Sequence, residues 1–113
     1  MSVEVKEFAK AADLLAEATG EKEVTIQTLK KKIKIKKVTV GELADIMKVA
    51  KDNELDQYIW LVYKGLTEPK LKPDEVRKLN HKVLLEIALE IQKFSELDKE
   101  SIDKLANLLK TKS

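Results

Sequence analysis

The chain has 113 residues, a formal net charge of +2 and no cysteine, with 43% hydrophobic and 37% charged residues. This composition is typical of a folded domain with a heavily charged surface, so we expect one domain spanning residues 1–113. The lack of cysteine excludes disulfide bonds, thiol nucleophiles and thiolate ligands for zinc or iron. The small net charge gives no general indication of a nucleic-acid or membrane partner.

The chain has no apolar run approaching the roughly 20 residues that cross a bilayer. Its first residues alternate charges where a signal peptide would carry an apolar block, so we expect a cytoplasmic protein. Arg77 is the only arginine among the basic residues. A surface rich in lysine and glutamate is a bias reported for hyperthermophile proteins and is compatible with a thermophilic source.

The spacing of apolar residues in the first third of the chain changes from a helical to a strand pattern. Residues 1–20 predict an amphipathic helix that ends before Gly20 and packs its narrow apolar face on the rest of the domain. That face carries Val5, Phe8, Ala12, Leu15 and Ala16. Apolar and polar residues then alternate, which predicts a basic β-hairpin over residues 23–38, with strands at about 23–29 and 33–38.

Residues 39–95 are the expected helical core. Thr39 and Glu42 match a capping box, and Val38 and Leu43 flank the same helix start as a hydrophobic staple. The helix that begins there is expected to end around residues 51–53. A second helix is expected over 54–66, where a run of six apolar residues would also suit a buried strand. We favour a helix because the apolar pattern extends beyond the run without turn residues.

Two prolines, Pro69 and Pro73, separate this helix from the next part of the core. Pro73 suits the first position of a short helix over 73–79, and Asn80 caps a longer apolar helix ending near Phe94. Asp98 is the expected cap of a last helix over 98–110. We therefore expect a mainly α (α+β) fold, with about five helices in a small irregular bundle and a two-stranded antiparallel hairpin in the N-terminal third.

Signatures of catalysis are missing, so we expect no enzyme activity, no catalytic residue and no cofactor. His81 follows a helix cap without a serine or cysteine motif to partner it, which favours a surface role. Glu86 and Glu90 share a helix face and would present two carboxylates to a metal. A solvated stripe is the favoured interpretation of this pair, because no second ligand pair is present, and we expect no metal site.

A run of lysines dominates the predicted hairpin. It holds six lysines in eight residues, namely Lys30, Lys31, Lys32, Lys34, Lys36 and Lys37. This charge attracts phosphates, but the arginines and aromatic residues typical of nucleic-acid grooves are lacking beside it. The favoured explanation is protection of an exposed edge strand from wrong pairing, or contact with a protein. A nucleic-acid role stays open.

Three aromatic residues, Tyr58, Trp60 and Tyr63, are the candidate partner-binding residues. They are spaced around the circumference of the 54–66 helix, so at least one is expected to point towards a neighbouring element or another molecule. Packing of all three in the core is the favoured interpretation, and partner binding is the sharper hypothesis. The core face is expected to carry Leu55, Ile59, Val62 and Leu66, and a displaced face Asp56, Trp60, Tyr63 and Thr67.

Four segments together resemble the small tail-assembly chaperones of long-tailed phages and related proviral elements. The likeness lies in a strand leading into a T-x-x-E helix start, an apolar helix, a G-L-x-E-P-x-L turn and a second apolar helix. It covers residues 33–95, whereas residues 1–30 and the last helix have no counterpart in it. The segments are Val38–Met47, Tyr63–Leu71, Asp74–Val76 and Val83–Ile87.

This resemblance implies a non-enzymatic chaperone that binds the helical tape-measure protein during tail assembly in the host cytoplasm. Such a protein keeps the apolar stripe of its partner out of water until tail-tube subunits displace it. The resemblance also implies weak self-association and no membrane partner. The alternative is a small nucleic-acid-binding accessory protein that uses the lysine-rich hairpin.

Overall fold

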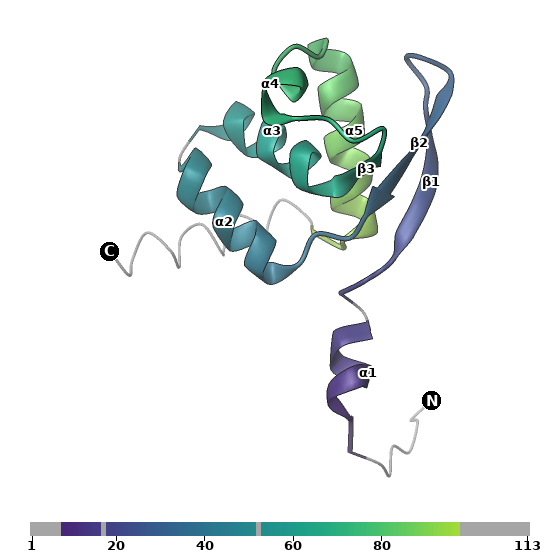
Figure 1. Ribbon diagram of the computed structural model, residues 1–113, viewed down its shortest axis with the longest axis vertical. Coiled ribbons are helices and arrows are strands. Elements are labelled where there is room, and N and C mark those ends of the chain that lie inside the picture. Colours follow the sequence, from purple (N-terminus) through teal and green to yellow (C-terminus); the bar gives the residue numbers. More distant parts are fainter. Residues whose placement is uncertain (1–7, 17, 52, 98–113) are drawn as a thin grey trace, which may run out of the picture.

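The computed structural model describes residues 8–16, 18–51 and 53–97, so the helix expected over 98–110 lies outside the described residues. The described chain runs through five helices and three strands (Figure 1). They are α1 (Ala11–Ala16), β1 (Glu21–Ile26), β2 (Lys31–Lys36), α2 (Val40–Ala50), α3 (Glu54–Gly65), β3 (Leu66–Glu68), α4 (Pro73–Val76) and α5 (His81–Phe94). The expected α+β class is confirmed.

The hairpin forms as predicted, but its strands begin at residues 21 and 31 rather than 23 and 33. A tight turn sets this register, because the N–H of Lys30 donates to the carbonyl of Ile26 at 2.7 Å. Lys30 lies in the left-handed region with φ 55°, which reverses the chain there. Val24 then faces Ile33 across the strands, and both side chains are buried.

A third strand extends the hairpin, so the prediction of a two-stranded sheet is wrong. The antiparallel strand order is β1-β2-β3, with Leu66 paired to Ile35 and Glu68 paired to Lys34. β3 follows α3 without a loop because Leu66 leaves the helix in an extended conformation. Three residues are too few to show an alternating pattern in the sequence.

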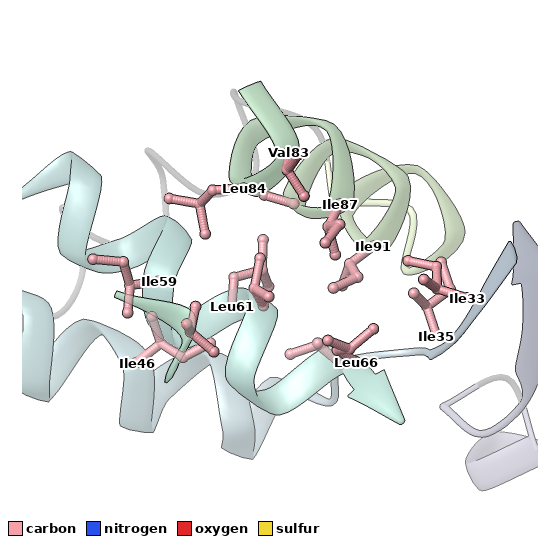
Figure 2. Packing of buried hydrophobic residues seen from close by; sticks show 14 of the residues in the cluster. Ile33, Ile35, Ile46, Ile59, Leu61, Leu66, Val83, Leu84, Ile87 and Ile91 are labelled. Atoms are coloured by element: carbon pink, nitrogen blue, oxygen red, sulfur yellow. The ribbon is translucent and has the colours of Figure 1, made fainter. Parts of the chain in front are cut away.

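Helix α3 lies at the centre of the body and packs against α2, α4 and α5, while α5 also covers one face of the hairpin. Figure 2 shows the resulting core, which continues from Ile33 and Ile35 of the sheet through Ile91 and Leu61 to Ile46 of α2. Of the expected core face of α3, the side chains at 59, 62 and 66 are buried. Leu55 is instead 55% exposed, because it lies in the first turn of the helix.

The helix starts are confirmed by their hydrogen bonds. The Thr39 hydroxyl accepts from the N–H of Glu42 at 3.2 Å, and the Glu42 carboxylate accepts from the N–H of Thr39 at 3.1 Å. Asn53 and Asn80 cap α3 and α5 through their side-chain carbonyls. These caps fix where each helix begins and thus which residues face the core.

Helix α1 does not pack as predicted. None of its residues is buried, and it stands away from the helices and the sheet (Figure 1). Its short apolar face is therefore not part of the core, and the expectation of a packed N-terminal helix is wrong. A search of the described helices finds none that is both long and apolar enough to span a membrane.

Candidate interaction surface

The structure brings together two of the three aromatic candidates. The rings of Trp60 and Tyr63 meet edge to face, with centroids 5.6 Å apart and planes at 88°. Both side chains are partly exposed and rest on the core. Aromatic pairs in this geometry hold each other in place beyond the effect of their buried area. They form the centre of what we call the aromatic face of α3, defined as Trp60 and Tyr63.

Tyr58 lies apart from this pair. Its hydroxyl donates to the Glu54 carboxylate at 3.1 Å, one helical turn earlier on α3. Partial burial, together with the neighbouring Glu54 carboxylate, raises the pKa of Tyr58 above its usual value. Tyr58 is therefore occupied by a local contact and does not contribute to the aromatic face.

Charged groups border the aromatic face. The ammonium groups of Lys64 and Lys70 lie 6.0 and 5.6 Å from the centroid of the Tyr63 ring, within cation–π range. On the α4 side, the Arg77 guanidinium donates to Asp56 at 3.2 Å and ties α4 to α3. The displaced face predicted from the sequence thus has an apolar centre and a charged margin. This is the usual composition of a protein interface.

The lysine run does not form one basic patch. β2 pairs with β1 over its whole length but with β3 only at Lys34 and Ile35, so the edge-strand interpretation is wrong for that part of β2 and stays a prediction for Lys31 and Lys32. The Lys34 ammonium lies 3.5 Å from the Glu68 carboxylate, and Lys36 lies 2.8 Å from that of Glu42. The charges of Lys34 and Lys36, in the second half of β2, are therefore paired within the molecule.

The remaining lysines of the run divide between two places. The Lys37 ammonium lies 5.5 Å from the centroid of the Phe94 ring, at the opposite end of the strand from the turn. Lys30, Lys31 and Lys32 are exposed at the turn itself. Within the run, these three, which we call the tip lysines, are the exposed ones.

Glu86 has a role that the sequence did not reveal. Its carboxylate accepts hydrogen bonds from the N–H groups of Gln27 and Thr28 and from the Thr28 hydroxyl, the last at 2.8 Å. These contacts fasten the turn of the hairpin to α5. Glu86 is still in contact with solvent, as expected of the stripe, but it also has this structural role, which the interpretation did not include. In the described ranges, no group of three or more acidic or histidine side chains is placed to hold a metal.

Two carboxylates make the fold sensitive to acid. The Thr28 hydroxyl, with the two backbone N–H groups, holds the pKa of Glu86 below the usual 4.5. Burial raises the pKa of Glu42, but the bonds to Lys36 and Thr39 outweigh it and leave this pKa below 4.5 as well. Both groups contribute stability that is fully present above pH 4.5 and is lost as the pH falls through their lowered pKa values.

We therefore expect a modest fall of the thermal midpoint below pH 4.5, because Glu86 is exposed to solvent, and we expect Glu86→Gln to reduce that fall. The substitution keeps the shape of the side chain but removes the negative charge of the carboxylate that accepts the hydrogen bonds of the turn. Melts followed by circular dichroism between pH 7 and pH 3 measure the effect, with Glu90→Gln on the same helix as the matched control. An equal acid response in wild type and Glu86→Gln would contradict this role for Glu86.

His81 is exposed at the start of α5, as expected of a residue beside the Asn80 cap.

Comparisons with protein-family models, with characterised proteins and with solved structures find no match to this chain. Its function therefore has to be argued from the surfaces described above.

Proposed function

We propose that the chain is a non-enzymatic tail-assembly chaperone that holds the helical tape-measure protein through the aromatic face of α3. The observation that carries the proposal is the edge-to-face pair of Trp60 and Tyr63, left partly uncovered on a helix that three others fix in place. The resemblance of residues 33–95 to tail-assembly chaperones supplies the identity of the partner.

A protein that holds an amphipathic partner helix needs an apolar surface with a polar margin, and the aromatic face has both. An amphipathic partner helix needs an apolar groove or face for its stripe, and tryptophan and tyrosine are the residues most enriched among strongly contributing contacts. Lys64 and Lys70 beside Tyr63 favour acidic residues along the margin of the partner stripe. A polar margin also lets the partner be released to another protein later.

The test is capture of a tape-measure fragment that is expressed together with the full chain. We expect the two to copurify at 0.3 M salt, because burial of an apolar stripe is little weakened by screening. A fragment whose stripe leucines are changed to serine is the control and is expected not to be retained. Equal retention of both fragments, or of neither, would contradict the proposal.

A nucleic-acid function is the second candidate, and the tip lysines are the observation in its favour. If this function is correct, retention on DNA or RNA is expected to fall steeply with salt. Lys30→Gln, Lys31→Gln and Lys32→Gln together would then lower the slope of log K against log salt by up to about 3. Lys36→Gln is the matched control, since that lysine is paired with Glu42. Unchanged retention in the triple variant would exclude the tip as the binding site.

A further inference from the structure

The outer edge of β1 is a row of backbone groups that no other described strand pairs with. β1 lies at the end of the strand order β1-β2-β3, with no labelled element on its outer side (Figure 1). The N–H of Lys37 donates to the carbonyl of Gly20 at 3.2 Å and continues the register of β1 with β2. Bonded and non-bonded pairs alternate in an antiparallel ladder, so the N–H and C=O groups of Glu21, Glu23 and Thr25 point away from β2.

Gln27 follows in the same row, and its N–H is already bound. It donates to the Glu86 carboxylate, which reaches the hairpin from α5. The row is therefore closed at the turn of the hairpin and open over the strand before it. An open row of N–H and C=O groups is the template on which an extended segment of another chain adds a strand.

The side chains along this row carry negative charge. Glu21 and Glu23 are exposed on the face of the sheet away from the core, and the register places them opposite Lys36 and Lys34 of β2. Both lysines bind carboxylates of other elements instead, at 2.8 Å in α2 and at 3.5 Å in β3. Across residues 8–16, 18–51 and 53–97, no side chain forms an ion pair with either glutamate. The open edge is thus also an acidic edge.

We propose that the outer edge of β1 binds an extended, basic segment of another protein, which adds a strand to the sheet. Lysine or arginine side chains at alternate positions of this segment pair with Glu21 and Glu23, because opposite charges that face each other across strands attract. The positions between them lie on the core side, beside Val24, where short apolar side chains fit. β2 has the same alternation of lysine and isoleucine on the other side of β1.

A second copy of the chain does not suit this edge. Antiparallel pairing of two β1 strands through the open row sets Glu23 opposite Glu23 or Glu21 opposite Glu23, and like charges in direct opposition are destabilising. The registers that avoid this place a glutamate opposite Gln27, whose N–H already donates to Glu86. The charges therefore select a partner of different sequence. This inference is independent of the proposed function, because the partner is extended and binds the sheet rather than α3.

Titration of the full chain with a short capped peptide, in which lysine and valine alternate, tests the proposal. We expect saturable binding below about 1 mM peptide, with hydrogen exchange of the Glu21 and Glu23 N–H groups slowed at least tenfold at saturation. A peptide with glutamate in place of lysine is the control and is expected to bind at least tenfold more weakly. No binding, equal binding of the two peptides, or protection only at other amides would overturn the inference. Protection of the same amides by raising the protein concentration without peptide would also overturn it, in favour of a second copy.

Two variants separate strand addition from attraction by charge alone. Thr25→Pro removes one outward N–H but keeps the bonds to β2 and both glutamates, and proline is tolerated on an edge strand. We expect it to weaken binding of the lysine peptide at least tenfold, while Thr25→Val, the matched control, does not. Glu21→Lys with Glu23→Lys is expected to reverse the preference, so that the glutamate peptide binds more tightly. Binding by Thr25→Pro at the strength of wild type, or an unreversed preference, would contradict the inference.

Discussion

Gly65→Ala is expected to lower the free energy of unfolding by about 2 kcal/mol, because α3 and α5 approach each other too closely for an added methyl group. A Cβ at this position would lie 2.7 Å from Cδ1 and from Cγ2 of Ile91. Ile91 is fully buried, so its side chain has no room to move aside. Urea denaturation of wild type and variant measures the difference.

Gly41→Ala is the matched control, since it also replaces a glycine inside a helix. The nearest atom to its added Cβ is 3.9 Å away, which is ordinary contact. We expect this variant to be as stable as wild type or slightly more so, because alanine favours helix by up to about 1 kcal/mol. Ile91→Val should recover part of the loss in Gly65→Ala by removing Cδ1. An unchanged stability in Gly65→Ala would contradict the close packing described here.

Trp60→Ala is expected to weaken capture of a tape-measure fragment by about 2 kcal/mol or more, the scale of a strongly contributing interface residue. It removes the larger half of the edge-to-face pair with Tyr63. The loss of folding stability is expected to be about 1 to 2 kcal/mol, because the indole is only partly buried. Quantitative pull-down and urea denaturation of the same variant measure the two effects.

Tyr58→Ala serves as the control for this variant. It removes a partly buried aromatic side chain from the same helix, but one that bonds to Glu54 and lies outside the aromatic face. We expect it to leave capture nearly unchanged. A stability loss of about 3 to 5 kcal/mol in Trp60→Ala, as for a fully buried tryptophan, would instead identify Trp60 as a core residue and reject the assignment.

The helical body could be predicted because its signals are local. The Thr39 cap and the Asn80 cap each lie within three residues of the N–H they accept, so the sequence carries the whole motif. The hairpin was predicted because Val24, Ile26, Ile33 and Ile35 alternate with polar residues. The bounds of its strands were wrong by two or three residues, since no favoured turn pair such as Asn-Gly marks the loop.

The contacts that could not be predicted join distant parts of the chain. Glu86 lies 58 residues from Thr28, and a glutamate on a helix that also carries lysines gives no sign that a turn will bind it. The pairing of Glu68 with Lys34 also joins residues far apart in the sequence, and it depends on a strand of only three residues. The packing of α1 was predicted from its apolar spacing. Such spacing shows that a helix has an apolar face, but not which surface that face packs against.

The proposed function also rests on a long-range feature, because the aromatic face exists only where α3 is held by its neighbours. Helical spacing already placed Trp60 and Tyr63 on one face without Tyr58, but it could not show that their two rings touch. The structure adds the edge-to-face contact of the two rings and the two lysines beside Tyr63. The structure weakens the case for the lysine run as a binding site, since Lys36 is paired with Glu42 and Lys34 with Glu68.

Calorimetric titration of the full chain with a helical tape-measure fragment tests the central claim most directly. We expect saturable binding that persists at 0.3 M salt and that Trp60→Ala weakens at least tenfold while Tyr58→Ala does not. No binding of the fragment would contradict the proposed function, and so would equal binding by wild type and Trp60→Ala.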